Sequence, residues 1–170
     1  DVGTNPDCKA ENLYQFGLLG SLYAHYVHNI SKPRVGLLNI GEEDKKGNIL
    51  TRQAYELMKA SKDFNFVGNI EGRDFHAGKA DIIVCDGFIG NVILKQTETL
   101  YKLVKQRNQS DEFFERFNYE NFGGTPILGI NKPVIVGHGI SSGLAIKNML
   151  LHSKEIYLAR LSEKIEGALN

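Results

Sequence analysis

The chain has 170 residues, with 20 basic and 20 acidic side chains, so its formal net charge is zero. Its length fits one domain or a large part of one, and the charge balance argues against nonspecific nucleic-acid binding through a strongly basic surface. A hydrophobic content of 42% is too high for a disordered chain, and no apolar run approaches the ~20 residues that span a membrane.

The sequence pattern predicts alternating helices and strands. Apolar residues recur at three- and four-residue steps over 10–30, which is typical of an amphipathic helix. Further along, we expect strands at 34–40, 64–70, 80–85 and 132–136, helices at 50–62, 92–106 and 111–117, an irregular segment at 119–131, and one long terminal helix after residue 142. The strand 80–85, ADIIVC, is apolar on both faces, as a buried parallel strand should be.

Strands that alternate with long helices indicate βαβ units. We therefore expect an α/β fold, with a doubly wound (Rossmann-like), largely parallel sheet that carries helices on both faces. Residues 1–170 would form a single α/β domain. The chain begins in a glycine turn of a kind that usually follows a strand, so we expect a further piece of the protein upstream of this turn.

Glycine is over-represented, with 18 of 170 residues, about 11% against an average near 7%. Many of these glycines lie in five turns that combine glycine with polar groups, at 1–5, 41–44, 71–74, 86–91 and 137–142. Ligands of open α/β sheets bind beyond the carboxyl ends of the strands. If the strands are parallel, all five turns share that edge, where glycine lets the backbone approach an anion closely.

The turn DGFIGN combines Asp86 at a strand end, Gly87 in the turn, and Gly90 and Asn91 at the start of the next helix. A helix N-terminus offers unpaired N–H groups and a partial positive charge, which suit phosphate. The alternative is a simple junction in which Asp86 or Asn91 caps the helix. The turn is neither a Walker A loop nor GxGxxG, so it implies no nucleotide.

The turn GHGISS places His138 between two glycines, where the ring could act as an acid, a base or a hydrogen-bond donor. Ser141 and Ser142 could cap the terminal helix and also bind an anion. The alternative is a helix cap with an incidental histidine.

A metal site is not predicted. The acidic residues at 42–44 could hold a metal, raise a carboxylate pKa or cap the next segment, but a solvated turn is the commoner explanation. Cys8 and Cys85 lack metal-ligand spacing, so we expect two reduced thiols. The basic residues nearest the turns are Lys45, Lys46, Arg73 and Lys95.

Five strings in order carry a family resemblance: DVGTNPD, VGLLNIGEE with KGN, FVGNIEGRD, ADIIVCDGFIGNVILK and YENFGGTPILGINKPVIVGHGISS. Over nearly the whole chain they resemble the phosphate acyltransferases of bacterial phospholipid synthesis, the PlsX family. Members are similar in fold to isocitrate and isopropylmalate dehydrogenases and to phosphotransacetylases. The resemblance implies transfer of a long-chain acyl group from acyl carrier protein to inorganic phosphate, which gives acyl phosphate. It further implies a cytoplasmic homodimer that associates peripherally with the membrane, without a cofactor or a nucleic-acid partner.

In such a reaction phosphate attacks a thioester carbonyl, and the oxyanion needs N–H or cationic donors. No covalent enzyme intermediate is required, which agrees with the absence of a GxSxG nucleophile turn. The residues that we expect to be catalytic are Asp86, His138 and Asn91. The residues that we expect to bind phosphate or the oxyanion are Gly87, Gly90, Lys95, Ser141 and Asn5.

Members of the family have an additional N-terminal half, so the resemblance implies that residues 1–170 are the C-terminal part of a longer enzyme. The segment 101–117 is shorter than the helical excursion that many members carry there, where partner, dimer and membrane contacts are expected. Ile140 and Gly143 also depart from a more serine-rich version of the last turn. Two alternatives stay open. One is a dehydrogenase of the isocitrate or isopropylmalate type, which should show carboxylates spaced for Mg²⁺ and an adenosine-binding loop. The other is a non-catalytic half that dimerises or binds a partner.

Overall fold

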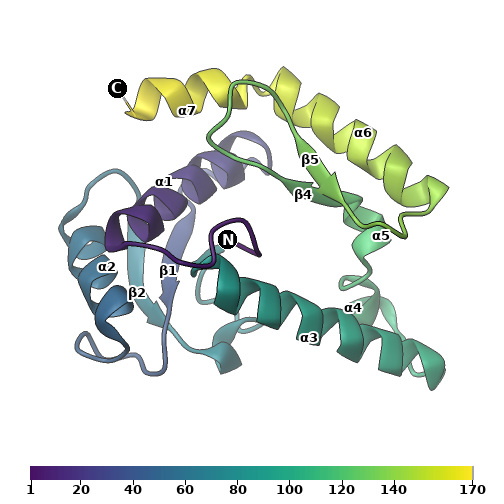
Figure 1. Ribbon diagram of the computed structural model, residues 1–170, viewed down its shortest axis with the longest axis horizontal. Helices are drawn as coiled ribbons and strands as arrows, with labels where there is room; N and C mark the ends of the chain where they lie inside the picture. Colours follow the sequence, from purple (N-terminus) through teal and green to yellow (C-terminus); the bar gives the residue numbers. More distant parts are fainter. Residues whose placement is uncertain (170) are drawn as a thin grey trace. The chain divides into compact units, whose positions relative to one another are not determined.

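The computed structural model describes residues 1–169 (Figure 1). The chain divides into two compact units, Asp1–Asn91 and Val92–Asn170. Helix α3, Gly87–Gln106, runs through the boundary between them. That residues 1–170 act as a single α/β domain stays a prediction, and each unit is described separately below.

The first unit alternates helices and strands as the sequence pattern predicts. Its elements in chain order are α1 (Ala10–Tyr26), β1 (Arg34–Leu38), α2 (Ile49–Ala60), β2 (Asn65–Ile70), the short 3₁₀ helix η1 (Gly72–Asp74), β3 (Ile82–Val84) and the first turn of α3. Asn48 starts α2, because its side-chain oxygen accepts a hydrogen bond from the backbone N–H of Thr51. The predicted helix at 10–30 ends earlier, at Tyr26.

The three strands form one parallel sheet in the order β2-β1-β3, which confirms an α/β fold. On β1, Val35 lies opposite Phe66 but the next residue lies opposite Gly68, so the ladder skips Val67. Gly68 has a φ of 97°, a conformation that glycine adopts with little strain. The bulge keeps the remaining residues of both strands in register up to their carboxyl ends.

The core of this unit lies between the sheet and the first two helices, which Figure 1 shows beside β1 and β2. Val35 and Leu37 point to the same side of β1 and are fully buried, together with Met58 of α2. The predicted close packing of α1 is confirmed at Gly20, where an added Cβ would lie 2.9 Å from a methyl carbon of Ile82. The helix approaches the sheet closely because glycine has no side chain at this contact.

Helix α3 begins five residues before the predicted start at residue 92. The difference has a local cause: the sequence DGFIGN combines two glycines, which favour a turn, but Asp86 caps the helix so that both glycines fall inside its first turn. No helix within residues 1–169 is long and apolar enough to cross a membrane.

The second unit contains the rest of α3 and a small antiparallel sheet. Its other elements are α4 (Glu112–Glu115), α5 (Tyr119–Phe122), β4 (Gly124–Pro126), β5 (Ile135–Gly137), α6 (Gly143–Leu158) and α7 (Leu161–Leu169). The expectation that 132–136 adds a strand to the parallel sheet is wrong. The strand forms at β5, but it pairs antiparallel with β4 (Figure 1). A short connection can join only antiparallel neighbours, and β4 lies in the segment that was expected to be irregular.

The expected single terminal helix is two helices. Arg160 has a φ of 52°, in the left-handed region, and separates α6 from α7. The break lets Ile156 before it and Leu161 and Ile165 after it all be buried. The apolar residues continue at helical spacing across Arg160, so the sequence pattern did not reveal that the helix ends there and a second helix begins.

Candidate functional site

The first turn of the chain contacts the junction between β3 and α3. The amino group of Asp1 donates to the carbonyl of Cys85 at 3.2 Å, and the backbone N–H of Gly87 donates to the carbonyl of Asn5 at 2.9 Å. Two of the five predicted turns thus meet within the first unit. Cys8 and Cys85 form no disulfide, as predicted.

The carboxylate of Asp1 organises this first turn. One oxygen accepts from the backbone N–H groups of Gly3 and Thr4, and the other accepts from both the backbone N–H and the side-chain amide of Asn5. Asn5, which was predicted to bind phosphate, therefore uses its side-chain amide to close the turn. Backbone N–H groups of the turn already surround a negative charge.

Asp86 caps α3, as one of the two interpretations of DGFIGN predicts. Its buried side chain accepts a hydrogen bond of 2.8 Å from the backbone N–H of Ile89. An added Cβ at Gly90 would lie 1.8 Å from the carbonyl oxygen of Asp1, and one at Gly87 would lie 2.8 Å from that of Asn5. In this structure the backbone that approaches the two glycines is that of the chain's own first turn. Phosphate binding at these glycines stays a prediction.

Asn91 lies one helical turn further on. Its side-chain amide donates to the carbonyl of Val2 at 2.9 Å, and Gly3 packs against the same amide. The amide nitrogen carries two hydrogens, so one remains for a further acceptor. Asn91 is thus a donor beside the first turn rather than a helix cap.

The predicted acidic cluster at 42–44 separates in the structure. Glu43 pairs with Lys46 at 3.9 Å, whereas Asp44 accepts from Lys59 at 2.6 Å and from the hydroxyl of Tyr55 at 2.5 Å. The hydrogen bond from Lys59, followed by that from Tyr55, lowers the pKa of Asp44. The three carboxylates of this turn do not converge on one metal position.

Glu42 instead joins two carboxylates that follow β2. The carboxylate oxygens of Glu42, Glu71 and Asp74 lie within 4.8 Å of one another, close enough to hold a cation. Lys79 already supplies a positive charge there, with its Nζ 2.5 Å from Glu42 and 2.9 Å from Asp74. The hydrogen bond from Lys79 lowers the pKa of Asp74, and Arg73 pairs with Glu71. The cluster is therefore largely neutralised by side chains.

Two buried asparagines at the same edge were missed by sequence reasoning. Asn39 donates to the side-chain oxygen of Asn69 at 3.1 Å and to the carbonyl of Lys46 at 3.0 Å. Asn69 donates to the carbonyl of Glu43 at 2.9 Å. The pair fixes the loop after β1. The available signal was an amide at the end of each of two apolar strands, since a buried polar group needs partners.

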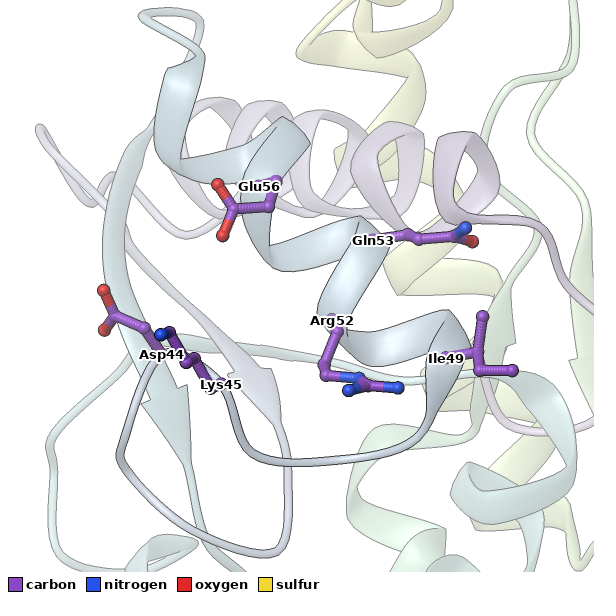
Figure 2. A pocket seen from close by; sticks show the side chains of 6 residues that line it. All are labelled: Asp44, Lys45, Ile49, Arg52, Gln53 and Glu56. Carbon is purple, nitrogen blue, oxygen red and sulfur yellow. The ribbon is translucent and has the colours of Figure 1, made fainter.

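A cavity of about 400 Å³ lies beside α2 and the loop before it. Figure 2 shows Arg52 and Gln53 leaving the helix in different directions. The residues that line the cavity are Asp44, Lys45, Ile49, Arg52, Gln53 and Glu56. Its wall carries both signs of charge, and it includes none of the predicted catalytic or phosphate-binding residues.

In the second unit His138 faces a glutamate that sequence reasoning missed. Its Nε2 lies 2.9 Å from Oε1 of Glu98, and Oε2 of Glu98 lies 3.3 Å from Nζ of Lys95. Burial raises the pKa of Glu98, but the hydrogen bonds from His138 and Lys95 together outweigh burial and bring this pKa below its usual value. The available signal was the spacing of Lys95 and Glu98, which places both on one helix face.

The turn that carries His138 is held by its own serines. The hydroxyl of Ser141 donates to the carbonyl of His138 at 2.7 Å. Ser142, the other predicted cap, accepts from the backbone N–H of Ala145 and so caps α6. The ring of His138 packs against that of Tyr119, with centroids 4.8 Å apart. The histidine is therefore fixed through both its backbone and its ring.

The predicted residues fall into two groups, each assembled within its own unit. The group in the first unit contains Asn5, Asp86, Gly87, Gly90 and Asn91. The group in the second unit contains Lys95, His138 and Ser141. That both groups form one site stays a prediction.

Comparison with known proteins identifies the family. A family model described as fatty acid synthesis protein matches residues 1–163. The chain belongs to this fatty acid synthesis protein family. The family resemblance carried by the five sequence strings is thereby confirmed.

Three curated relatives of the chain share the name "Phosphate acyltransferase". The chain is 44% identical over 186 residues to "Phosphate acyltransferase" of Acidobacterium capsulatum, covering 98% of this chain and 55% of the relative. It is 43% identical to the protein of that name from Thermoanaerobacterium thermosaccharolyticum, covering 92% and 52%, and 45% identical to that from Syntrophomonas wolfei, covering 96% and 52%. The chain therefore spans about half the length of the curated relatives it matches.

Proposed function

We propose that this chain acts as part of a phosphate acyltransferase. The enzyme moves a long-chain acyl group from acyl carrier protein to inorganic phosphate and releases acyl phosphate for phospholipid synthesis. The observation that carries the proposal is identity of 43–45% along nearly the whole chain to proteins named "Phosphate acyltransferase". The match to the fatty acid synthesis protein family over residues 1–163 supports the same metabolic area.

The reaction does not require a covalent intermediate between the acyl group and the protein. A phosphate oxygen attacks the thioester carbonyl, a C–O bond forms, the C–S bond breaks, and the departing sulfur takes a proton. Placing two reactants side by side contributes much of the rate of such a step, and donors aimed at the developing oxyanion contribute the rest. The remaining amide hydrogen of Asn91 is one such donor, because only one of its two bonds is made to Val2.

The second group supplies charge and proton transfer. His138 is held by Glu98 at 2.9 Å, and its turn is closed by Ser141. The Lys95 ammonium lies beside the same carboxylate, so Lys95 and Glu98 carry compensating charges. We assign proton transfer to His138 and a charge-balancing role to Lys95. Asp86 orients the start of α3. Phosphate binding at Gly87 and Gly90 would require the first turn of the chain, whose carbonyl oxygens lie against both glycines, to move aside.

The finer expectations for the whole protein belong to the same proposal. We infer a doubly wound sheet of the isocitrate dehydrogenase and phosphotransacetylase type, a cytoplasmic homodimer with peripheral membrane association, and partners limited to acyl carrier protein and phosphate. We expect neither a cofactor nor a nucleic-acid partner. The zero formal net charge supports the last point, because nonspecific nucleic-acid binding draws on a basic surface.

A phosphate-dependent assay tests the proposal. The complete natural protein is incubated with a long-chain acyl thioester of acyl carrier protein, and free thiol is followed with and without inorganic phosphate. We expect thiol release that rises with phosphate and saturates, with acyl phosphate as the product. Thiol release that is absent, or that does not depend on phosphate, would contradict the proposed function. The 170-residue chain run beside it shows whether this part suffices, and adding NAD(P)⁺ to both tests the dehydrogenase alternative.

A further inference from the structure

Glu98 is a mostly buried carboxylate between two more exposed groups. Its side chain is 11% exposed, against 32% for His138 and 54% for Lys95. Each of its oxygens has a different partner, with Oε1 facing His138 and Oε2 facing Lys95. A buried carboxylate is costly unless its charge is compensated and its oxygens are hydrogen-bonded. Here Lys95 supplies the compensating charge and His138 supplies a hydrogen bond.

The contact fixes which ring nitrogen of His138 carries a proton. An ionised carboxylate only accepts hydrogen bonds, and the two hydrogen bonds keep Glu98 ionised at neutral pH. Nε2 of His138 must therefore be the donor to Glu98. In a neutral imidazole the other nitrogen, Nδ1, is then an acceptor. Among residues 1–169, Nδ1 has no hydrogen-bond partner.

The ring lies next to a cavity large enough for a ligand. The cavity measures about 320 Å³, and the two residues whose side chains touch the His138 ring, Glu98 and Tyr119, both line it. Lys102 and Lys105 add positive charge to its wall and Glu120 adds negative charge, while Lys105 also pairs with Glu115. All of these residues belong to the second unit.

We propose that Glu98 is the positioning residue of His138, which it holds in the Nε2–H tautomer with Nδ1 available as the proton acceptor. This inference rests on the proposed acyl transfer. As the oxygen of hydrogen phosphate forms its bond to the thioester carbon, its proton passes to Nδ1. As the C–S bond breaks, Nδ1 returns that proton to the departing sulfur, so the ring is neutral before and after the step. Lys95 keeps the Glu98 carboxylate charged throughout.

The chain contains a second histidine–glutamate contact that serves as a matched control. Nδ1 of His152 lies 3.3 Å from Oε2 of Glu155, three residues further along α6. Glu155 is 65% exposed, so water can replace it as a partner. The two pairs share their chemistry and differ in the burial of the carboxylate.

The test compares Glu98→Gln with Glu155→Gln in the complete natural protein, using two measurements. The first is the ¹⁵N chemical shifts of the His138 ring, which distinguish the two tautomers. The second is kcat and KM of phosphate-dependent thiol release from acyl–acyl carrier protein. In Glu98→Gln we expect the preference for the Nε2–H tautomer to be lost, because the neutral amide can either donate or accept. We also expect kcat to fall by about 10²-fold, with KM for phosphate changed by less than about threefold. Glu155→Gln should match the wild type in both.

Glu98→Asp separates charge from folding, since it keeps the carboxylate on a shorter side chain. We expect it to recover the tautomer preference and part of kcat. A wild-type tautomer with wild-type kcat in Glu98→Gln would overturn the inference, as would a Glu98→Asp variant no better than Glu98→Gln. If the wild-type protein forms no acyl phosphate, the proposed function fails by itself. The ring spectra of the same variants then still decide whether Glu98 sets the tautomer.

Discussion

Glu98 and His138 are 40 residues apart in the sequence, yet Oε1 of the first lies 2.9 Å from Nε2 of the second. The contact joins α3 to the turn before α6 within the second unit. It gives Nε2 of the histidine a defined hydrogen-bond acceptor and explains why a mostly buried glutamate is tolerated at this place.

The first prediction concerns the capping hydrogen bond that Asp86 makes at the start of α3. Asp86→Ala removes the acceptor for the backbone N–H of Ile89 and should lower the free energy of unfolding by about 1 kcal/mol. Asp86→Asn keeps an acceptor oxygen and should cost clearly less. Urea denaturation of both variants checks the difference. Equal losses in the two variants would show that the side chain's charge, rather than its capping bond, stabilises the helix.

The second prediction concerns the close contact between the first turn of the chain and Gly90 of α3. Gly90→Ala places a methyl group 1.8 Å from the carbonyl oxygen of Asp1, so the turn must move, and we expect a loss of about 1–3 kcal/mol. Gly143→Ala is the matched control, because no atom lies within 4 Å of an added Cβ there and alanine favours a helix. Thermal unfolding followed by circular dichroism measures both. A Gly90→Ala protein as stable as Gly143→Ala would refute the close contact.

The third prediction concerns the buried amide pair of Asn39 and Asn69. Asn39→Ala or Asn69→Ala leaves the partner amide with an unmet hydrogen bond, which should cost about 1–3 kcal/mol. The double variant should cost less than the sum of the two, because neither amide is then left unpaired. A double-mutant cycle in urea provides the measurement. Additive losses would mean that the two side chains act independently.

The fourth prediction concerns the pH dependence of the contribution that Glu115 makes to stability. Hydrogen bonds from Lys105, then Ser110 and Tyr101, lower its pKa from 4.5 to about 2. A carboxyl group with a lowered pKa stabilises the folded state above its unfolded pKa, and this contribution is lost as the pH falls through its folded pKa. Glu115→Gln should therefore lower Tm at pH 7 by a small amount, since the group is exposed, and the difference from wild type should vanish between about pH 4.5 and pH 2. Glu166→Gln, at an exposed position of α7, is the control. A Tm difference that persists at pH 2 would contradict this account.

The sequence pattern predicted much of the first unit, because hydrophobic periodicity is a local property. The strands near 34–40, 64–70 and 80–85 all formed, and their parallel pairing followed from the intervening helices. Helix ends were predicted less well. The start of α3 depends on whether Asp86 caps the helix, and the break at Arg160 depends on a single left-handed residue.

The second unit was harder to predict, since its structure depends on contacts between distant residues. A strand at 132–136 could be recognised, but its antiparallel partner β4 lay in a glycine-rich segment without strand periodicity. The same limit applies to the site. His138 stood out between two glycines, whereas Glu98 looked like any charged residue of an amphipathic helix until the fold placed it beside the ring.

The predicted site residues are tested by paired substitutions. Asn91→Ala removes the amide donor beside the first turn, and His138→Ala removes the proton acceptor. We expect each substitution to reduce kcat for acyl-phosphate formation by about tenfold to a hundredfold. Gly143→Ala, which adds a methyl group where no atom lies within 4 Å, is the control. Wild-type kcat in both site variants would refute this assignment of residues.

The central claim is direct attack of phosphate on the acyl thioester. It is tested most directly by supplying phosphate labelled with ¹⁸O at all four oxygens to the complete natural protein, together with an acyl thioester of acyl carrier protein, and weighing the product by mass spectrometry. We predict acyl phosphate that retains all four labelled oxygens, because the phosphate oxygen forms the new bond to carbon and no P–O bond breaks. Free fatty acid carrying oxygen from water, with no labelled acyl phosphate, would contradict the account.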